Sequence, residues 1–389
     1  MTSARRRVAV TGMGVVAPCG IGVEAFWRGL FRAPAPGEQS LAGWEPTRWL
    51  DARDAKRTDR FAQLAVASAD MAVSASGWLD RAPRNPGVVI ATALGGVRTY
   101  EEQVLVLDRR GERRVSPYLI PMFMGNAAAA TVSMRLGWRG PCEIVLTACA
   151  AGTHAIGYGA RLVGEGSCDV VVAGGAESAS TPAVTASFRM MRALSPSGRL
   201  RPFDADRDGF VISEAAAALV LEDYEGARRR SATIHGEVIA CGSTADAHDI
   251  TAPPADGGGA ALCMRQALAA AGIGPADVRQ INAHGTGTRL NDAAEACAIA
   301  SVFGPSGPPV TSTKGATGHA FGATGALEAV AVLLSMRHVL IPPTLGLERR
   351  DALCEVDVVP HGRPWAPGPA ISNSFGFGGH NACLVLGPP

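Results

Sequence analysis

Residues 144–163 read IVLTACAAGTHAIGYGARLV and carry most of the information about the fold. The stretch opens with an apolar run, Ile144–Leu146, that favours a buried β-strand. Small residues follow, and the Ala- and Gly-rich segment Ala155–Val163 has the apolar spacing of a helix. A strand that runs through a small-residue turn into a helix is typical of an α/β fold, and Cys149 stands at the junction.

Other short apolar runs bounded by Gly or Pro repeat this pattern. Strands that are apolar along their whole length are typical of a sheet covered on both faces. Ala-rich segments with helical spacing lie between them, such as Phe61–Ala75. The predicted strands of this part of the chain are Val88–Ala91, Ile144–Leu146, Val170–Ala173 and Leu219–Leu221.

The same alternation restarts after the basic run Arg228–Arg230. In each half a strand enters a small-residue turn and then an Ala-rich helix, so we expect an internally duplicated chain. The predicted halves are residues 1–232, which carry Cys149, and residues 233–389, which carry His284 and His319. The predicted elements of the second half are Ile234–Ala240, Gly259–Ala271, Val278–Ala283, Asp292–Val302, Val310–Ser312 and Gly322–Met336.

Composition limits the possible partners. The chain has 389 residues, 47% of them hydrophobic, with 36 Lys plus Arg against 35 Asp plus Glu. This balance predicts no general affinity for nucleic acid or an anionic membrane. No apolar run reaches the roughly 20 residues that cross a bilayer. Three arginines lead directly into Val8–Val10 without an apolar signal region, so we expect a cytoplasmic protein.

The cysteines and the first glycines exclude two further kinds of site. The 9 cysteines are scattered without paired spacing, so neither a disulfide framework nor a zinc site is predicted. The opening strand, Val8–Val10, is expected to run into a glycine turn at Gly12 and Gly14. These glycines leave the dinucleotide-binding fingerprint incomplete, which argues against nucleotide binding.

Cys149 has two interpretations. At the start of a helix, unsatisfied N–H groups and the helix dipole favour the thiolate, so we expect a lowered thiol pKa and a nucleophile. The alternative is a small buried hydrophobic residue in an Ala-rich helix.

Two histidines occupy matching positions in the second half. His284 lies in the glycine turn NAHGTGT, residues 282–288, directly after a predicted strand. His319 lies in KGATGH, residues 314–319, also after a strand. A strand-end turn faces a site more often than a core, although each histidine alone could be structural.

A glycine-rich segment near the end of the chain, NSFGFGGHN, covers residues 373–381. Such a loop can move and can offer a backbone N–H to an oxyanion. The alternative is a hairpin that closes the sheet before the strand Ala382–Leu386.

Together these motifs resemble one family. The segments around Cys149, His284, Lys314 with His319, and Phe375–Gly379 stand in the order and spacing of elongating β-ketoacyl-[acyl carrier protein] synthases. The resemblance runs from Val8 to Leu386 and includes RPFD, residues 201–204, and DGFV, residues 208–211. It implies a thiolase-like, five-layered αβαβα fold with internal duplication, and an acyltransferase that acts as a dimer.

The resemblance also implies roles for site residues. Cys149 would receive the acyl chain from a carrier-protein thioester, and His284 and His319 would assist decarboxylation of a malonyl thioester. Lys314 would order the site through Glu328. The backbone N–H groups of Cys149 and Phe377 would form the oxyanion hole. Neither a metal nor a bound cofactor is implied, because the substrates are carried on the phosphopantetheine of the acyl carrier protein.

Further positions follow from the same resemblance. Thr286 and Thr288 would bind the phosphopantetheine arm, and Phe377 with Phe375 would belong to a gating loop. Met124 and Phe188 would lie near the acyl pocket. The implied docking residues for an acidic carrier protein are Lys56, Arg57 and Arg192, for which ordinary solvated surface charge is the alternative.

Departures from the family pattern, such as Ala150–Ala151 in the nucleophile turn, suggest a specialised relative. We therefore expect a bacterial dissociated polyketide synthase, with a fatty-acid elongation enzyme as the near alternative. A non-catalytic chain-length subunit would lack Cys149, and the chain could itself pair with such a Cys-less homologue or with a second copy of itself. A thiolase is disfavoured, since the late Cys383 lies in a predicted strand rather than in a glycine turn.

Overall fold

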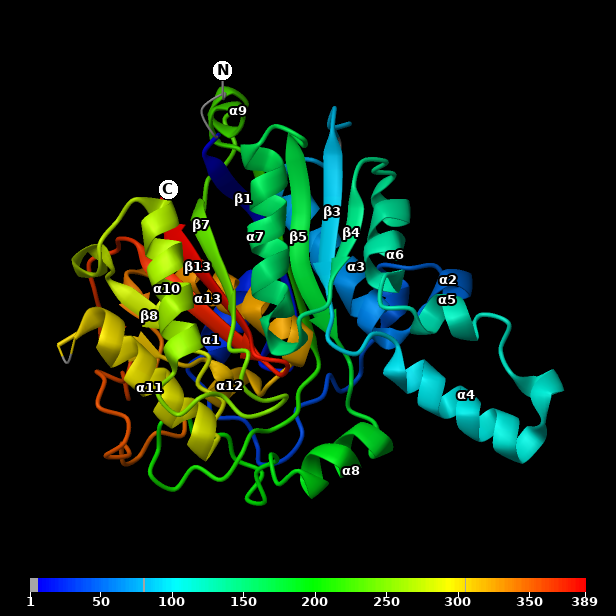
Figure 1. Ribbon diagram of the computed structural model, residues 1–389. Coiled ribbons are helices and arrows are strands. Elements are labelled where there is room, and N and C mark those ends of the chain that lie inside the picture. The colour runs from blue at the N-terminus through cyan, green and yellow to red at the C-terminus, as the bar shows by residue number, and fades with distance from the viewer. Residues whose placement is uncertain (1–5, 80, 305) are drawn as a thin grey trace.

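The computed structural model describes residues 6–79, 81–304 and 306–389, and its main element is a sheet with eleven strands in these residues (Figure 1). Ten of the strands form two sets of five, one from each half of the chain, and β2 (Gly20–Ile21) pairs with β1. The first set is β1 (Val8–Ala17), β3 (Pro86–Ala91), β4 (Cys142–Val145), β5 (Val170–Glu177) and β6 (Ala215–Asp223). The second set is β7 (Gly236–Ala245), β8 (Gln280–Asn282), β9 (Val310–Thr311), β12 (Ala370–Gly376) and β13 (His380–Gly387).

The two sets have the same topology. The spatial order is β4-β3-β5-β6-β1 in the first and β9-β8-β12-β13-β7 in the second. In each set the first three strands are parallel to one another, and the fourth is antiparallel to both of its neighbours. The sets meet where β1 pairs with β7, at Ala9 and Val10. The predicted duplication is therefore confirmed, and the chain has a thiolase-like fold.

Helices complete the five layers. The helices α3 (Arg60–Ser76) and α6 (Ala127–Leu136) share a core with one face of the first set of strands. In the middle, α7 (Ala151–Gly164) and α13 (Thr324–His338) pack between the two sets. The helices α10 (Gly258–Ala271) and α11 (Arg289–Phe303) cover the outer face of the second set. Every residue of α13 from Thr324 to Met336 is buried, as expected for a helix surrounded by protein.

The glycine turn predicted at Gly12 and Gly14 is wrong. Strand β1 continues through both residues, with a register shift between Val10 and Gly12. A Cβ atom on Gly12 would lie 2.1 Å from the carbonyl oxygen of Ala72, so glycine here lets α3 pack directly on the strand. The glycines serve helix–sheet packing rather than a turn.

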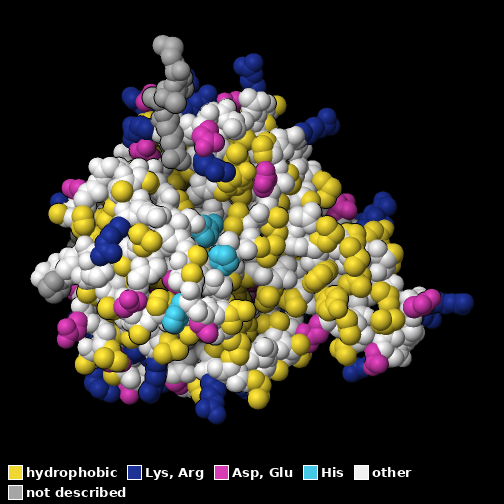
Figure 2. Space-filling view, in the orientation of Figure 1, with side chains coloured by type: hydrophobic (Ala, Val, Ile, Leu, Met, Phe, Trp, Pro, Cys, Tyr) yellow, Lys and Arg dark blue, Asp and Glu magenta, His cyan; other side chains and the backbone are white. Residues whose placement is uncertain are grey.

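The remaining elements surround this core. They are α1 (Val23–Gly29), α2 (Ala52–Ala55), α4 (Val97–Arg110), α5 (Leu119–Phe123), α8 (Pro182–Met190), α9 (Tyr224–Arg229), α12 (Lys314–Thr317), β10 (Leu340–Ile341) and β11 (Arg363–Pro364). Helices α4 and α5 form an arm that projects beyond β4, and hydrophobic side chains gather on the face over α5 and α6 (Figures 1 and 2).

The predicted division after residue 232 falls between α9 and β7 and stays a prediction. Among the described residues, no helix is both long enough and apolar enough to span a membrane.

Candidate active site

Cys149 lies in a tight turn between β4 and α7. The turn is a short 3₁₀ helix, Ala148–Ala150, directly followed by the first residue of α7. Ala148 has a φ of 49°, a left-handed conformation that costs an L-residue about 1–2 kcal/mol. The backbone of Gly376 packs against this turn, since a Cβ there would lie 3.0 Å from the Cys149 nitrogen. Close packing of small residues thus holds the nucleophile position.

The thiol of Cys149 faces an imidazole. Its Sγ atom lies 3.2 Å from His319 Nε2. Burial raises the pKa of Cys149 to about 12, although the charge of Lys314 and the backbone N–H groups of Cys149 and Phe377 act in the opposite direction. The lowered pKa expected from the helix start is therefore wrong, because desolvation of the thiolate outweighs the neighbouring donors. The resting residue is a neutral thiol.

His319 is held from both of its sides. Its backbone N–H donates to Val211 at 2.8 Å, and its Nδ1 lies 3.2 Å from Thr324 Oγ1 at the start of α13. Burial, reinforced by the charge of Lys314, lowers the pKa of His319 well below its ordinary value. The imidazole beside Cys149 is therefore neutral at physiological pH.

His284 follows β8, as predicted, and is nearly buried at 3% exposure. The N–H groups of His284 and Gly285 each donate to the carboxylate of Glu295 at 2.8 Å. The rings of His284 and His319 stand 5.5 Å apart, centre to centre, at a steep angle. Both imidazoles therefore border the same small space.

Lys314 connects His284 to Glu328 in the buried interior. Its Nζ atom donates to Glu328 Oε1 at 2.6 Å and to the carbonyl oxygen of His284, and it lies 3.3 Å from His284 Nδ1. An ammonium group can only donate, so Nδ1 of His284 must accept and the ring proton must be on Nε2. This tautomer gives His284 an N–H donor. Burial and Lys314 also lower the pKa of His284 well below its ordinary value, which keeps the ring neutral.

In the polar core behind the histidines, two buried side-chain oxygens, Asn282 Oδ1 and Asn373 Oδ1, have no hydrogen-bond partner among the described residues. Burial raises the pKa of Glu328 to about 7 despite its contact with Lys314. In the part of the chain that the structure describes, no group of three or more His, Cys, Asp or Glu could hold a metal ion.

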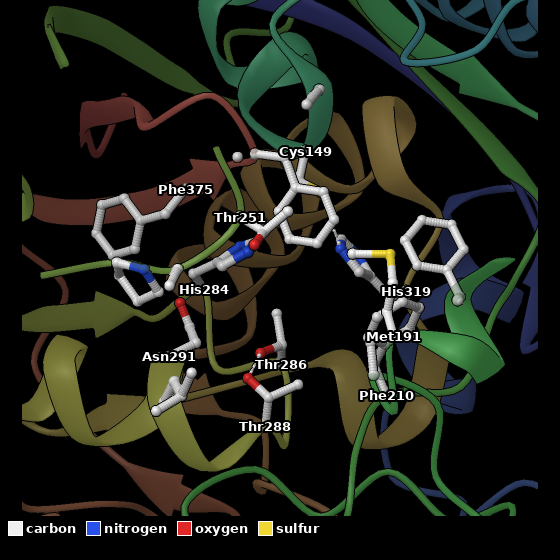
Figure 3. A pocket seen from close by; sticks show the side chains of 18 of the residues that line it. Cys149, Met191, Phe210, Thr251, His284, Thr286, Thr288, Asn291, His319 and Phe375 are labelled. Carbon is white, nitrogen blue, oxygen red and sulfur yellow. Dashed lines mark hydrogen bonds between the residues drawn. The ribbon is translucent and has the colours of Figure 1, made fainter. Parts of the chain in front are cut away.

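A cavity of about 730 Å³ leads from the surface to Cys149, His284 and His319 (Figure 3). Cys149, His284 and His319 line it together with the side chains of Thr286 and Thr288, whose hydroxyl oxygens are 2.9 Å apart. An aromatic wall stands beside His319. There the ring of Phe188 stacks on Phe321 at 5.2 Å and meets Phe210 edge-on at 5.3 Å, and Met191 borders the same space. The cavity thus has a polar side and an apolar side.

The glycine-rich segment is a hairpin whose tip lines the cavity. Strands β12 and β13 pair up to Gly376 and His380, and Phe375 and Phe377 both border the cavity. Two backbone hydrogen bonds tie the tip to residues 246–250, from Asp246 to Gly379 at 2.9 Å and from Gly378 to Ile250 at 2.7 Å. The hairpin interpretation is confirmed, and the tip of this hairpin presents Phe377 to the site.

Four of the predicted site residues lie at the rim of the cavity or outside it. Met124 follows α5, is 43% exposed and lies outside the cavity. Lys56 and Arg57 follow the end of α2, also outside the cavity, and the guanidinium of Arg57 lies 4.5 Å from the Tyr118 ring centre. Arg192 lines the cavity at its exposed rim. Four of the predicted residues therefore line the same cavity as Cys149, His284 and His319: Phe188, Thr286, Thr288 and Arg192. Met124, Lys56 and Arg57 do not line it.

Sequence reasoning missed a second set of buried residues. Glu177, at the end of β5, accepts from the N–H of Ala93 at 2.6 Å and of Gly322 at 3.2 Å, and its charge raises the pKa of Cys149. Burial raises the pKa of Glu177 itself to about 7. Glu295 supports the His284 turn in the same way. The available signal was an acid within an otherwise small or apolar segment, GGAES at residues 174–178 for Glu177.

Comparisons with known proteins agree with this geometry. Models of the β-ketoacyl synthase N-terminal and C-terminal domains match residues 41–227 and 235–348. The 3-oxoacyl-[acyl-carrier-protein] synthase 2 of Synechocystis sp. is 40% identical over 98% of each chain.

Two solved structures are also similar over nearly the whole chain. The ishigamide ketosynthase/chain length factor has a TM-score of 0.93 and 34% identity, covering 99% of this chain and 100% of its own. A type II polyketide ketosynthase bound to a hexaketide and in complex with its acyl-carrier protein has a TM-score of 0.90 and 31% identity, with the same coverage. The chain therefore belongs to the β-ketoacyl synthase family of condensing acyltransferases.

Proposed function

We propose that this enzyme condenses an acyl group on Cys149 with a malonyl group, both delivered in the cytoplasm by acyl carrier protein. The observation that carries the proposal is the 3.2 Å contact between Cys149 Sγ and His319 Nε2 at the end of a cavity that His284 also lines. A nucleophile and two neutral imidazoles meet there. The acyl-carrier-protein part is supported by the name of the Synechocystis relative and by the carrier complex of the polyketide ketosynthase.

In the first half-reaction Cys149 takes the acyl group. Its sulfur attacks the thioester carbonyl, the bond to the pantetheine sulfur breaks, and the thiol proton passes to the leaving sulfur, while His319 Nε2, 3.2 Å from Sγ, keeps its own proton. The carbonyl oxygen accepts from the backbone N–H groups of Cys149 and Phe377, which already face the sulfur. The raised thiol pKa means that proton transfer accompanies attack, since little thiolate exists beforehand.

In the second half-reaction malonyl thioester loses carbon dioxide. The bond to the carboxylate breaks, and its electron pair forms an enolate whose oxygen accepts hydrogen bonds from His284 and His319. The enolate carbon attacks the acyl carbon on Cys149, the carbon–sulfur bond breaks, and one proton from water restores the thiol. The products are a β-ketoacyl thioester and carbon dioxide.

Two pathways fit this chemistry. A bacterial type II polyketide system is supported by the similarity to a type II polyketide ketosynthase and to the ishigamide ketosynthase/chain length factor. Fatty-acid elongation is the second candidate, supported by the 40% identity to the Synechocystis enzyme. A non-catalytic chain-length subunit is disfavoured, because Cys149 and both histidines are present and close together.

An acidic carrier protein would dock at the positive residues near the mouth. Arg192 borders the cavity rim, and Lys56 and Arg57, which follow α2, would extend the contact. The stacking of Arg57 on Tyr118 leaves its charge available, since a cation over a ring is not neutralised. Complementary charge of this kind mainly raises the association rate.

The face beside β4 is suited to a second subunit, either a copy of this chain or a homologue. Strand β4 is the edge of the sheet, and large apolar side chains near it are exposed. An exposed apolar patch beside an unpaired strand edge favours association. Met124 lies on this face, so a contact with an acyl chain would be made across the interface. The exposed side chains are Ile120 (59%), Met124 (43%), Met134 (74%) and Leu146 (53%).

Intact-protein mass spectrometry after incubation with acyl-carrier thioester tests the proposal. The wild-type protein should gain one acyl mass and, with malonyl-carrier thioester added, release carbon dioxide and lose that mass. Cys149→Ala should gain nothing, whereas Cys297→Ala, which removes an exposed cysteine, should behave as wild type. If the wild-type protein gains no mass, or if Cys149→Ala gains as much as wild type, the nucleophile is misassigned.

A further inference from the structure

We propose that Arg289 binds the phosphate of the phosphopantetheine arm at the mouth of the cavity. The inference rests on the proposed function, and it adds a residue with a specific chemical partner. Arg289 begins α11, immediately after the turn that carries His284, Thr286 and Thr288. All four residues line the same cavity.

These four residues run from the interior to the surface. His284 is 3% exposed and Thr286 is 6% exposed, whereas Thr288 is half-buried and Arg289 is exposed. The backbone turns at Gly285 (φ 40°) and Gly287 (φ 73°), so the five steps from His284 to Arg289 span less than the roughly 17 Å of a fully extended segment. An arm that brings its thioester to His284 therefore follows this segment outward, with its amides beside the threonine hydroxyls and its phosphate beside Arg289.

The charge of Arg289 is available for an anion. Among the described residues Arg289 has neither an ion pair nor a side-chain hydrogen bond, and the carboxylate that its charge affects, Asp351, is held by Arg207. The carboxylates that line the cavity already have other donors. Asp208 accepts from Ser195, Asp246 from Asn381, and Asp249 from the backbone of Thr251.

The backbone at Arg289 is rigidly placed. The buried guanidinium of Arg207 donates to the carbonyl oxygens of Thr288 at 3.2 Å and Arg289 at 3.1 Å. The first turn of α11 is also anchored by Asp292, which accepts from Phe203 at 2.8 Å. A planar guanidinium on such a support can donate two parallel hydrogen bonds to a phosphate, which an ammonium cannot.

The test compares two acyl donors that differ only in the phosphate, acyl-phosphopantetheine and acyl-pantetheine. For Arg289→Ala, the second-order rate constant for acylation of Cys149 should fall about 3- to 10-fold with the phosphorylated donor. It should not change with acyl-pantetheine. With the phosphorylated donor, the rate constant of Arg289→Lys should lie between those of wild type and Arg289→Ala. The loss caused by Arg289→Ala should shrink at high salt.

Arg228→Ala is the matched control, because it removes an exposed cation from the remote helix α9. It should behave as wild type with both donors. Equal losses with both donors, or no loss with either, would overturn the assignment of Arg289. If the wild-type protein accepts neither donor nor acyl-carrier thioester, the proposed function itself fails, and this outcome is distinct from the first two.

Discussion

The ammonium group of Lys314 lies 3.3 Å from Nδ1 of His284 and also donates to that residue's carbonyl oxygen. One buried cation thus determines which ring nitrogen of His284 is protonated and where the turn lies. The second partner of Lys314, Glu328, contributes a carboxylate that is 1% exposed. The donor properties of one histidine therefore depend on an ion pair that never contacts the substrate.

The two histidines should separate the half-reactions. His284→Ala should still gain an acyl mass on Cys149, while decarboxylation of malonyl thioester falls on the order of 10²- to 10³-fold, as for loss of an oxyanion donor. His319→Ala should slow both steps, because His319 contacts the thiol as well. Mass spectrometry of the acyl-enzyme and assay of carbon dioxide measure the steps independently. Normal condensation by either variant would contradict the assigned roles.

Removal of Lys314 should harm both stability and activity. Lys314→Met leaves the buried carboxylate of Glu328 without its cation, which costs about 3–5 kcal/mol in unfolding free energy. The double variant Lys314→Met/Glu328→Gln should recover part of that stability but not the decarboxylation rate, because His284 still lacks its donor. Urea unfolding and carbon dioxide release are the two measurements. Recovery of activity together with stability would show that Lys314 acts only on the fold.

The reactivity of Cys149 should increase continuously with pH. Because burial raises the pKa of the thiol to about 12, the thiolate fraction grows about tenfold per pH unit above pH 8; nearer pH 7 the rise is shallower, because Glu177, whose pKa is about 7, ionises there and its charge raises the pKa of Cys149. His284 and His319 have lowered pKa values and stay neutral at these pH values, so neither adds an inflection. The rate of alkylation by iodoacetamide, followed on Cys149 itself, checks this. A plateau near pH 7 would indicate the lowered pKa that the helix start alone predicts.

The aromatic wall should influence acyl-chain preference. Phe188→Ala removes the ring that stacks on Phe321, so the apolar side of the cavity widens. We expect relative acylation rates to shift toward longer or bulkier acyl groups, with a stability cost of about 1–3 kcal/mol for a half-buried ring. Met190→Ala, on a side chain that is 83% exposed, is the control and should leave the preference unchanged. An unchanged order of acyl donors in Phe188→Ala would place the acyl chain elsewhere.

The apolar face beside β4 should determine the oligomeric state. Ile120→Asp introduces a charge at a side chain that is 59% exposed, so a subunit interface there would be weakened. Sedimentation velocity should then report a smaller particle than for wild type. Leu262→Asp alters a comparably exposed leucine (48%) on α10 and should not change the sedimentation coefficient. A dimer that survives Ile120→Asp would argue for another interface.

Much of the site is predictable because its motifs are local. Cys149 lies in a strand–turn–helix and His284 directly follows β8, so apolar periodicity and small residues locate both turns. The short helix α12 stands between β9 and His319, where the sequence predicts only a small-residue turn after a strand. Thr286 and Thr288 follow from the same turn as His284. Repetition of the pattern in the second half likewise predicts the duplicated fold, because each half builds its strands from nearby sequence.

Other properties depend on contacts between distant segments, and here the sequence misleads. The helix start suggests a low pKa for Cys149, but β12 and η5 (Phe321–Ala323) pack over the turn, and desolvation raises the pKa instead. The sequence pattern at Gly12 and Gly14 resembles a turn, but in the structure both glycines lie within β1, where they let α3 pack closely on the strand.

The sequence by itself determined the α/β class and the duplication, because these follow from local patterns of apolar and small residues, and its resemblance to the β-ketoacyl synthases pointed to Cys149, His284 and His319 as site residues. Only the tertiary structure decided the protonation states, the tautomer of His284 and the path from the cavity mouth at Arg289 to Cys149. Burial and charge at a site are set by every segment that packs around it, and those segments are far apart in the chain.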